Sequence, residues 1–136
     1  MADDLRALLR SLSPLLAEGK YFIGTFSEAQ MMGLANYLPH IICIFREQEG
    51  LTVVFEEKAR EPLSIYTEKK IQGPFALITF KQETSLLDVG ITAEFSAALS
   101  RAKIPANVFA GYHHDHVLVP YESREAALTS LKKLQK

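Results

Sequence analysis

The two halves of this 136-residue chain show the same succession of apolar patterns. In each half, a strand-like run precedes a helix-like stripe, two further strand-like runs and a second helix-like stripe. The residues themselves are not repeated, so the repeat is one of pattern only. A β-α-β-β-α-β order is typical of ferredoxin-like units, in which an antiparallel sheet has its helices on one face. We therefore predict an α+β fold of two such units packed together, comprising residues 1–70 and 71–136.

In the first half, leucines at helical spacing from Leu5 to Leu16 predict an amphipathic helix that covers a sheet and ends near Gly19. Ser27 and Gln30 have the spacing of a capping box and predict a short helix after the first strand. The other elements expected in this half are strands at 21–26, 40–46 and 51–56 and a helical turn at 57–60.

The second half is expected to contain strands at 75–80, 107–110 and 116–119. Its first helix follows a stripe from Ile91 to Ala102, and its terminal helix begins at Ser123. Because this half ends in a helix, the last strand of the second unit must come from elsewhere in the chain. Otherwise, one edge of its sheet stays open.

Charge and cysteine content exclude several classes of protein. A net charge of -1 argues against nucleic-acid binding and against a polybasic membrane anchor. The longest apolar stretch, around Ile41 to Phe45, is far shorter than a membrane span, and the acidic N-terminus is not a secretory signal. We expect a cytoplasmic protein without an internal disulfide, since Cys43 is alone and lies in an apolar strand.

The most conspicuous polar cluster is His113, His114, Asp115 and His116. Alternate residues of an extended chain point to opposite faces, so at most two of these side chains converge and a metal site is disfavoured. We interpret them as polar residues of a turn. A weaker alternative makes His114 or His116 a general acid-base group oriented by Asp115. Phosphate-cradle and nucleophile-elbow motifs are absent, so the sequence offers no support for either kind of site, and we expect no cofactor.

The segment 85–92 leads from a strand into a helix, where free backbone N–H groups favour an anion such as an amino-acid carboxylate. Ser85 and Asp88 show a second capping-box spacing. Gly90 costs a helix about 1 kcal/mol relative to alanine, so its presence needs a reason. Close approach of a ligand and close packing of helix on sheet both remain open.

Residues 85–93 and 107–120 together resemble the ACT domain, and more narrowly the small bacterial tandem-ACT proteins. The segment from Asp115 to Pro120 is also similar to the final ACT domain of the cytosolic arginine sensors of animal cells. The strong similarity spans about residues 73–122, and the first half matches the bacterial family more loosely.

The resemblance implies a non-catalytic regulatory module that binds an amino acid, forms a homodimer and responds by shifting between two states. Gly90 and its neighbours would meet the ligand backbone, Asp115 would bind an ammonium or guanidinium group, and Tyr112 and His114 would line the pocket. The ligand-binding residues that it implies are Ser85, Val89, Gly90, Ile91, Gly111, Tyr112, His114 and Asp115. The alternative is a structural module that dimerises through sheet edges without a ligand.

Overall fold

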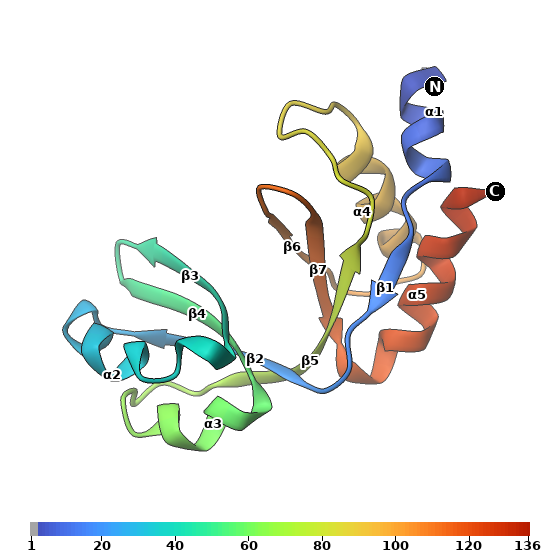
Figure 1. Cartoon of the computed structure of the whole chain (residues 1–136). Coiled ribbons are helices and arrows are strands. Elements are labelled where there is room, and N and C mark those ends of the chain that lie inside the picture. Colours follow the sequence, from blue (N-terminus) through green and yellow to red (C-terminus); the bar gives the residue numbers. More distant parts are fainter. Residues whose placement is uncertain (1–2) are drawn as a thin grey trace. The chain divides into compact units, whose positions relative to one another are not determined.

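The computed structural model describes residues 3–136, which divide into two compact units. The first, here called the nested unit, comprises residues 19–75. The second, the split unit, comprises residues 3–18 together with residues 76–136. The chain therefore begins in the split unit, forms the nested unit and then returns, as the colours of Figure 1 show.

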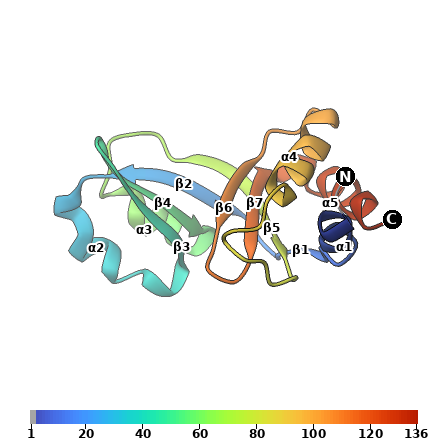
Figure 2. The ribbon, with the colours of Figure 1, turned by 90° about the horizontal axis from the view of Figure 1, so that it is seen from above.

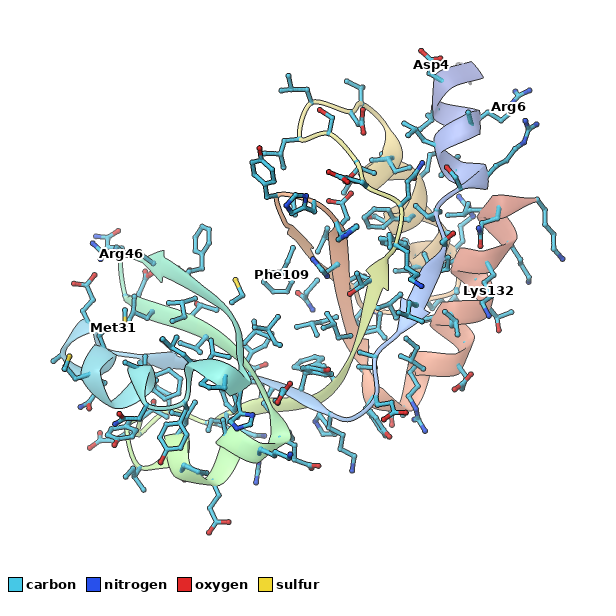
Figure 3. The ribbon with its side chains drawn as sticks, in the orientation of Figure 1. Asp4, Arg6, Met31, Arg46, Phe109 and Lys132 are labelled. Atoms are coloured by element: carbon cyan, nitrogen blue, oxygen red, sulfur yellow. The ribbon has the colours of Figure 1, made fainter. Side chains whose placement is uncertain are left out.

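The nested unit has the β-α-β-β-α-β order predicted for the first half. Its elements are β2 (Tyr21–Phe26), η1 (Glu28–Gln30), α2 (Met31–Ala35), η2 (Leu38–His40), β3 (Ile41–Glu47), β4 (Gly50–Glu56), α3 (Glu57–Ser64) and the first residues of β5 (Gln72–Phe80). The strands lie in the order β3-β4-β2-β5, and the neighbouring pairs are antiparallel. Near the end of β3 lies Arg46, which is labelled in Figure 3. Its Nε is 3.1 Å from Oε1 of Glu28 in η1, and the two side chains form an ion pair.

Alternation along the strands builds the core of the nested unit on one face of its sheet. The buried residues of β2 and β4 on this face are joined by residues of the two α-helices. This core comprises Phe22, Phe26, Leu34, Leu51, Val53, Phe55, Ala59 and Leu63. Figure 1 shows α2 and α3 on the same side of the strands, as predicted for a ferredoxin-like unit.

The split unit is assembled from both ends of the chain. Its elements are α1 (Asp3–Arg10), β1 (Pro14–Leu16), the remainder of β5, α4 (Ile91–Arg101), β6 (Asn107–Ala110), β7 (Asp115–Pro120), η3 (Tyr121–Ser123), α5 (Arg124–Lys132) and η4 (Lys133–Gln135). The strands lie in the order β1-β5-β7-β6. This is the strand order of a second ferredoxin-like unit, in which β1 takes the place of the last strand.

The core of the split unit also lies on one face of its sheet. Residues of β5 and β7 at alternate positions contact the apolar stripe of α4, two residues of α5 and the leucines of the N-terminal segment. This core comprises Leu9, Leu12, Ala76, Ile78, Phe80, Ile91, Phe95, Leu99, Ile104, Val117, Val119, Ala127 and Leu131. Figure 2 shows α1, α4 and α5 gathered on one side of the unit's strands.

The missing last strand of the second unit comes from the N-terminal segment. Pro14 pairs with Phe80 and Leu16 with Ile78 in an antiparallel ladder. The predicted helix through Leu16 is therefore wrong at its end, because α1 stops at Arg10. Pro14 disfavours the helical conformation in the residue before it, and Ser13 adopts a positive φ of 49°. The chain then continues as the strand β1, so Leu15 and Leu16 are not part of the helix.

The predicted division at residue 70 assigns the N-terminal segment to the first unit, whereas in the structure this segment belongs to the split unit. Residues 3–18 lie with the split unit, because β1 hydrogen-bonds to β5 and Leu9 and Leu12 belong to that unit's core. The boundary between the strands of the two units falls inside β5, after Phe75. A division by sequence pattern cannot show such an exchange, since pairing between distant segments leaves no local periodicity.

Local differences from the predicted elements have local causes. Ser27 stands at the N-cap of η1, but its side chain makes no capping bond, so the predicted capping box is not formed. The expected helical turn at 57–60 continues through Pro62 to Ser64 as α3. A proline inside a helix removes one intrahelical hydrogen bond, but α3 continues two residues beyond Pro62.

Candidate functional site

The predicted site residues of the split unit lie on two neighbouring segments, the loop between β5 and α4 and the turn between β6 and β7. The Thr84 N–H donates to the His113 carbonyl over 3.2 Å, and His113 Nδ1 lies 3.1 Å from Glu83 Oε1. His114 Nδ1 lies 3.3 Å from the Gln82 carbonyl oxygen. These contacts hold the turn that contains Gly111, Tyr112 and His114 beside the loop that leads to Ser85 and Gly90.

Asp115 is a buried carboxylate at the first residue of β7, with only 7% of its surface exposed. Its pairing partner across the hairpin is Ala110. The Thr84 hydroxyl donates to Asp115 Oδ2 over 3.5 Å, which is a long and weak hydrogen bond. Within residues 3–136, no lysine, arginine or histidine forms an ion pair with it. Burial of an unpaired charge is costly, so this carboxylate favours a cation.

The side chains of Ser85 and Asp88, which have the spacing of a capping box, both accept hydrogen bonds from backbone N–H groups. These bonds close a turn that lies before the helix. The Ser85 N–H donates to Asp88 Oδ2 over 2.8 Å, and the Leu87 N–H donates to Ser85 Oγ over 3.1 Å. The helix itself begins later, at Ile91, with Gly90 as its N-cap. The helix thus begins where the predicted stripe begins, at Ile91, whereas Ser85 and Asp88 order the loop ahead of it.

Gly90 is explained by its backbone and by a close neighbour. Its φ of 96° lies in the left-handed region that favours glycine. A Cβ at this position would lie 2.9 Å from Leu5 Cδ2, so the residue also accommodates a side chain of α1. The close neighbour of Gly90 is thus a side chain of α1, and not the sheet that we considered from the sequence. Contact of Gly90 with a ligand stays a prediction.

The remaining predicted residues differ widely in exposure. Ile91 is part of the core, so its backbone rather than its side chain is left for a ligand. Val89 and Tyr112 are 86% and 80% exposed. The Tyr112 ring packs edge-on against His113, with ring centroids 4.8 Å apart. The structure therefore brings Asp115 and His114 against the loop and leaves Val89 and Tyr112 at the surface.

Sequence reasoning missed two residues that contact this cluster, Thr84 and Gln82. Thr84 donates to Asp115, as described above. Gln82 donates through Nε2 to Ser11 Oγ, and its Oε1 is buried with no hydrogen-bond partner among the described residues. Neither residue is part of a recognisable sequence motif, because both lie in the loop after β5, which has no periodic pattern. Their roles become visible only when the β6–β7 turn is placed beside that loop.

His116 of β7 is partly buried, and its polar neighbours are Thr79, His114 and Asp115. Its Nδ1 lies 2.8 Å from Thr79 Oγ1 on β5. Burial lowers the pKa of His116 below its usual value, and nearby His114 lowers it further, whereas the Asp115 carboxylate raises it. His116 is therefore favoured in its neutral form in the folded protein.

This pKa shift predicts a loss of stability in acid. Because the folded state disfavours protonation of His116, the unfolded state binds more protons between the lowered pKa and the ordinary value of 6.5. The contribution is present above pH 6.5 and is lost as the pH falls through the folded pKa. Urea denaturation of wild type and His116→Gln from about pH 8 to about pH 5 should show a smaller decline for the variant. An equal decline would contradict this role for His116.

The described part of the chain sets two further limits on the site. Among the side chains of residues 4–136, no group of three or more histidine, cysteine, aspartate or glutamate residues is arranged to hold a metal ion. None of the helices in this range combines the length and the apolar run that crossing a bilayer requires.

Comparison with protein families identifies two matches in tandem. Models described as ACT domain match residues 2–70 and residues 73–133. A search of curated proteins found no significant match.

Solved structures resemble the whole chain. A protein of unknown function from Vibrio cholerae, described as a possible transport protein, is 38% identical, with a TM-score of 0.78 over 97% of this chain and 96% of the other. A protein from Agrobacterium tumefaciens is 18% identical, with a TM-score of 0.69 over 90% and 88% of the two chains. The ligand-free regulatory subunit of aspartate kinase from Thermus thermophilus is 14% identical, with a TM-score of 0.72 over 92% and 97%.

Proposed function

The chain belongs to the ACT domain family, and on that premise we propose that it is a non-catalytic regulatory module that binds an amino acid in its split unit. The family assignment supports a role in ligand response. The likeness to the aspartate kinase regulatory subunit is a likeness of fold, and it supports the same proposal by analogy.

One observation carries the proposal: Asp115 is a buried carboxylate without a cation among the described residues. An ammonium or guanidinium group of a ligand would supply that cation in a charge-assisted hydrogen bond. Thr84 already contacts the carboxylate and would keep it in place. The ligand carboxylate would be held by backbone N–H groups near Gly90, at the N-terminus of α4.

Binding would act on the arrangement of the two segments that form the site. Hydrogen bonds between Thr84 and His113 and between His114 and Gln82 join the β5–α4 loop to the β6–β7 turn. A ligand that contacts both segments binds better to the state in which they are held together, and it shifts the population toward that state. The predicted homodimer would transmit this shift to a partner.

The proposal predicts a thermal shift that depends on Asp115. A ligand present at about 100 times its dissociation constant should stabilise the folded protein by about 2.7 kcal/mol. In a panel of amino acids, we expect at least one with a cationic side chain to raise the melting temperature of wild type. Asp115→Asn, which preserves the shape of the side chain, should abolish that rise. Glu125→Gln removes an exposed charge in α5 of the same unit and should leave it unchanged.

Two outcomes would overturn the proposal. One is a panel in which no amino acid changes the melting temperature of wild type. The other is a thermal shift of equal size in wild type and Asp115→Asn. In either case, the alternative of a structural module that dimerises through its sheet edges would be preferred. That alternative predicts a dimer without ligand and no effect of Asp115→Asn on its dissociation.

A further inference from the structure

The helices α4 and α5 of the split unit have a groove between them, with a volume of about 410 Å³. Three of the side chains that line this groove are small, which leaves space between the two helices. The lining residues are Ala98, Arg101, Ala102, Ser130, Lys133 and Leu134. The groove therefore has an apolar floor and one cation on each helix.

The two cations of the groove are exposed and have no carboxylate partner. Neither Arg101 nor Lys133 forms an ion pair with the side chains of residues 4–136. The acidic residues of the two helices are Glu94 and Glu125, and each lies in the first turn of its helix. Cations near the end of a helix are favoured by its dipole, but here they also flank apolar surface. The groove therefore suits an apolar segment that carries a carboxylate.

The loop between β5 and α4 contains such a segment. Leu86, Leu87 and Val89 are 64%, 87% and 86% exposed, and Asp88 lies among them in the chain (Figure 1). Large apolar side chains that cluster at the surface often mark a contact with another protein. Neither Leu86 nor Leu87 belongs to the ligand site proposed above, so binding of an amino acid does not account for their exposure.

We propose that the β5–α4 loop of one molecule binds in the α4–α5 groove of a second molecule. The leucines of the loop cover the apolar floor of the groove, and this burial is the main favourable contribution. Asp88 forms a charge-assisted hydrogen bond with Arg101 or Lys133 and orients the loop. The contact thus explains the exposed leucines and the unpaired cations together.

The contact joins two molecules, because the loop and the groove lie at opposite ends of α4. This helix comprises 11 residues, Ile91–Arg101, so its ends are about 15 Å apart. Loop and groove are different surfaces, so repetition of the contact gives a ring or an open chain, unlike a two-fold dimer. It requires neither Asp115 nor a ligand, and it can therefore fail or hold separately from the proposed function.

The test mixes two variants, each of which lacks one side of the contact. Leu87→Ser removes an apolar side chain from the loop, and Arg101→Glu reverses a charge in the groove. When isotope-labelled Leu87→Ser is titrated with unlabelled Arg101→Glu, we expect saturable amide NMR shifts at residues 98–102 and 130–134. The dissociation constant should be about 10 µM to 1 mM, as for other small interfaces. Unlabelled Leu87→Ser should bind at least about 10-fold more weakly, because one leucine fewer is buried.

Matched controls separate this contact from general effects of charge and apolar surface. Adding Arg101→Glu or Lys133→Glu to the labelled protein should abolish the shifts. Arg10→Glu should preserve them, because Arg10 lies in the last turn of α1 as Arg101 does in α4, but does not line the groove. In the unlabelled protein, Ile65→Ser removes a side chain that is 78% exposed in the nested unit, and it should change the affinity less than about 2-fold. The amide spectrum of each variant alone shows that it is folded.

Three results would overturn the proposal. The first is a lack of saturable shifts up to about 1 mM of the unlabelled protein. The second is equal weakening by Arg10→Glu and Arg101→Glu, which would show a general effect of charge. The third is binding of equal strength by unlabelled Leu87→Ser, which would show that the groove accepts a surface other than the β5–α4 loop.

Discussion

Leu12→Ala is expected to destabilise the split unit by about 2–5 kcal/mol. Leu12 is 1% exposed and belongs to the core that α4, α5, β5 and β7 form. Truncation to alanine removes buried methyl groups and leaves a cavity that the surrounding side chains fill only in part. The loss should appear as a lower urea midpoint with an unchanged slope, since the surface exposed on unfolding stays similar.

The matched control is Leu15→Ala in β1, three residues further along. Leu15 is 50% exposed, so its truncation should cost well under about 1 kcal/mol. Hydrogen exchange then locates the effect. Leu12→Ala should accelerate exchange at amides of residues 76–80 and 117–119 and leave amides of residues 51–55 protected. Faster exchange confined to residues 51–55 would show that the N-terminal segment belongs to the nested unit, contrary to the structure.

Gly90→Val is expected to cost about 2–4 kcal/mol of stability, mainly from backbone strain and to a smaller extent from contact with the Leu5 side chain. A β-branched residue is strained at a φ of 96°, and its Cβ would meet Leu5 of α1 at 2.9 Å. The control is Gly19→Val, because Gly19 has a similar φ of 89° and nothing within 4 Å of a Cβ. Gly19→Val therefore measures the backbone strain alone.

Urea denaturation of both variants, and of Gly90→Val combined with Leu5→Ala, checks this account. The Gly90 variant should lose more stability than the Gly19 variant, and Leu5→Ala should recover part of the difference. Equal losses at the two glycines would contradict close packing of α1 on the start of α4. Gly90→Val is also a poor probe of ligand binding, because it would destabilise the fold whether or not Gly90 contacts a ligand.

The strands and the larger helices could be predicted from the sequence because each has its own periodicity. The strand at 107–110 coincides with β6, and the stripe that begins at Ile91 coincides with α4. The repeated order of these elements was enough to predict two ferredoxin-like units, and the ACT assignment confirms that fold. These features are local, so a single sequence contains them.

The features that were missed depend on contacts between distant segments. β1 has three residues, and its leucines also fit the preceding helical stripe, so only its ladder with β5 distinguishes it. Within the site, Asp115 was predicted, but its burial and its contact with Thr84 require the β6–β7 turn to lie beside the β5–α4 loop. Neither arrangement follows from spacing along the chain.

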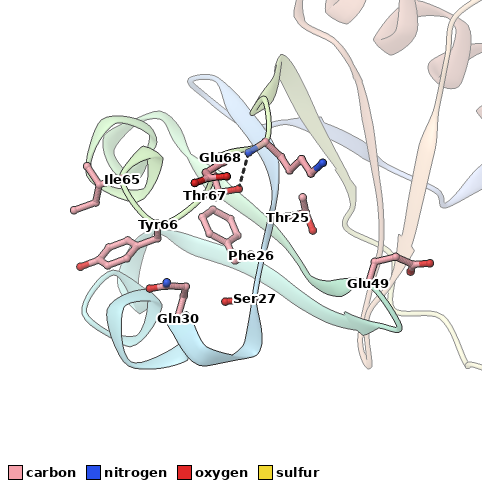
Figure 4. Close-up of a pocket in the computed structure, with 10 residues that line it drawn as sticks. Thr25, Phe26, Ser27, Gln30, Glu49, Ile65, Tyr66, Thr67 and Glu68 are labelled. Carbon is pink, nitrogen blue, oxygen red and sulfur yellow. Dashed lines mark hydrogen bonds between the residues drawn. The ribbon is translucent and has the colours of Figure 1, made fainter.

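The nested unit also contains a pocket that the sequence does not predict, for the same physical reason (Figure 4). Its lining comes from three segments that are adjacent only in the fold, and Glu68 and Lys69 lie in a stretch without helical or strand periodicity. Glycine at position 33 is the sequence feature nearest to a signal, because it allows Tyr66 to approach α2. That reason is visible only once the ring is in place.

The central claim is that Asp115 binds the cationic group of a small ligand in the split unit. Native mass spectrometry of freshly purified protein tests it most directly, because one spectrum shows both the oligomer and any retained ligand. Wild type should carry an additional small mass, or should acquire one from an equimolar mixture of amino acids. Asp115→Asn should show the mass of the polypeptide alone. An unliganded wild type in that mixture, or the same adduct on both proteins, would contradict the claim.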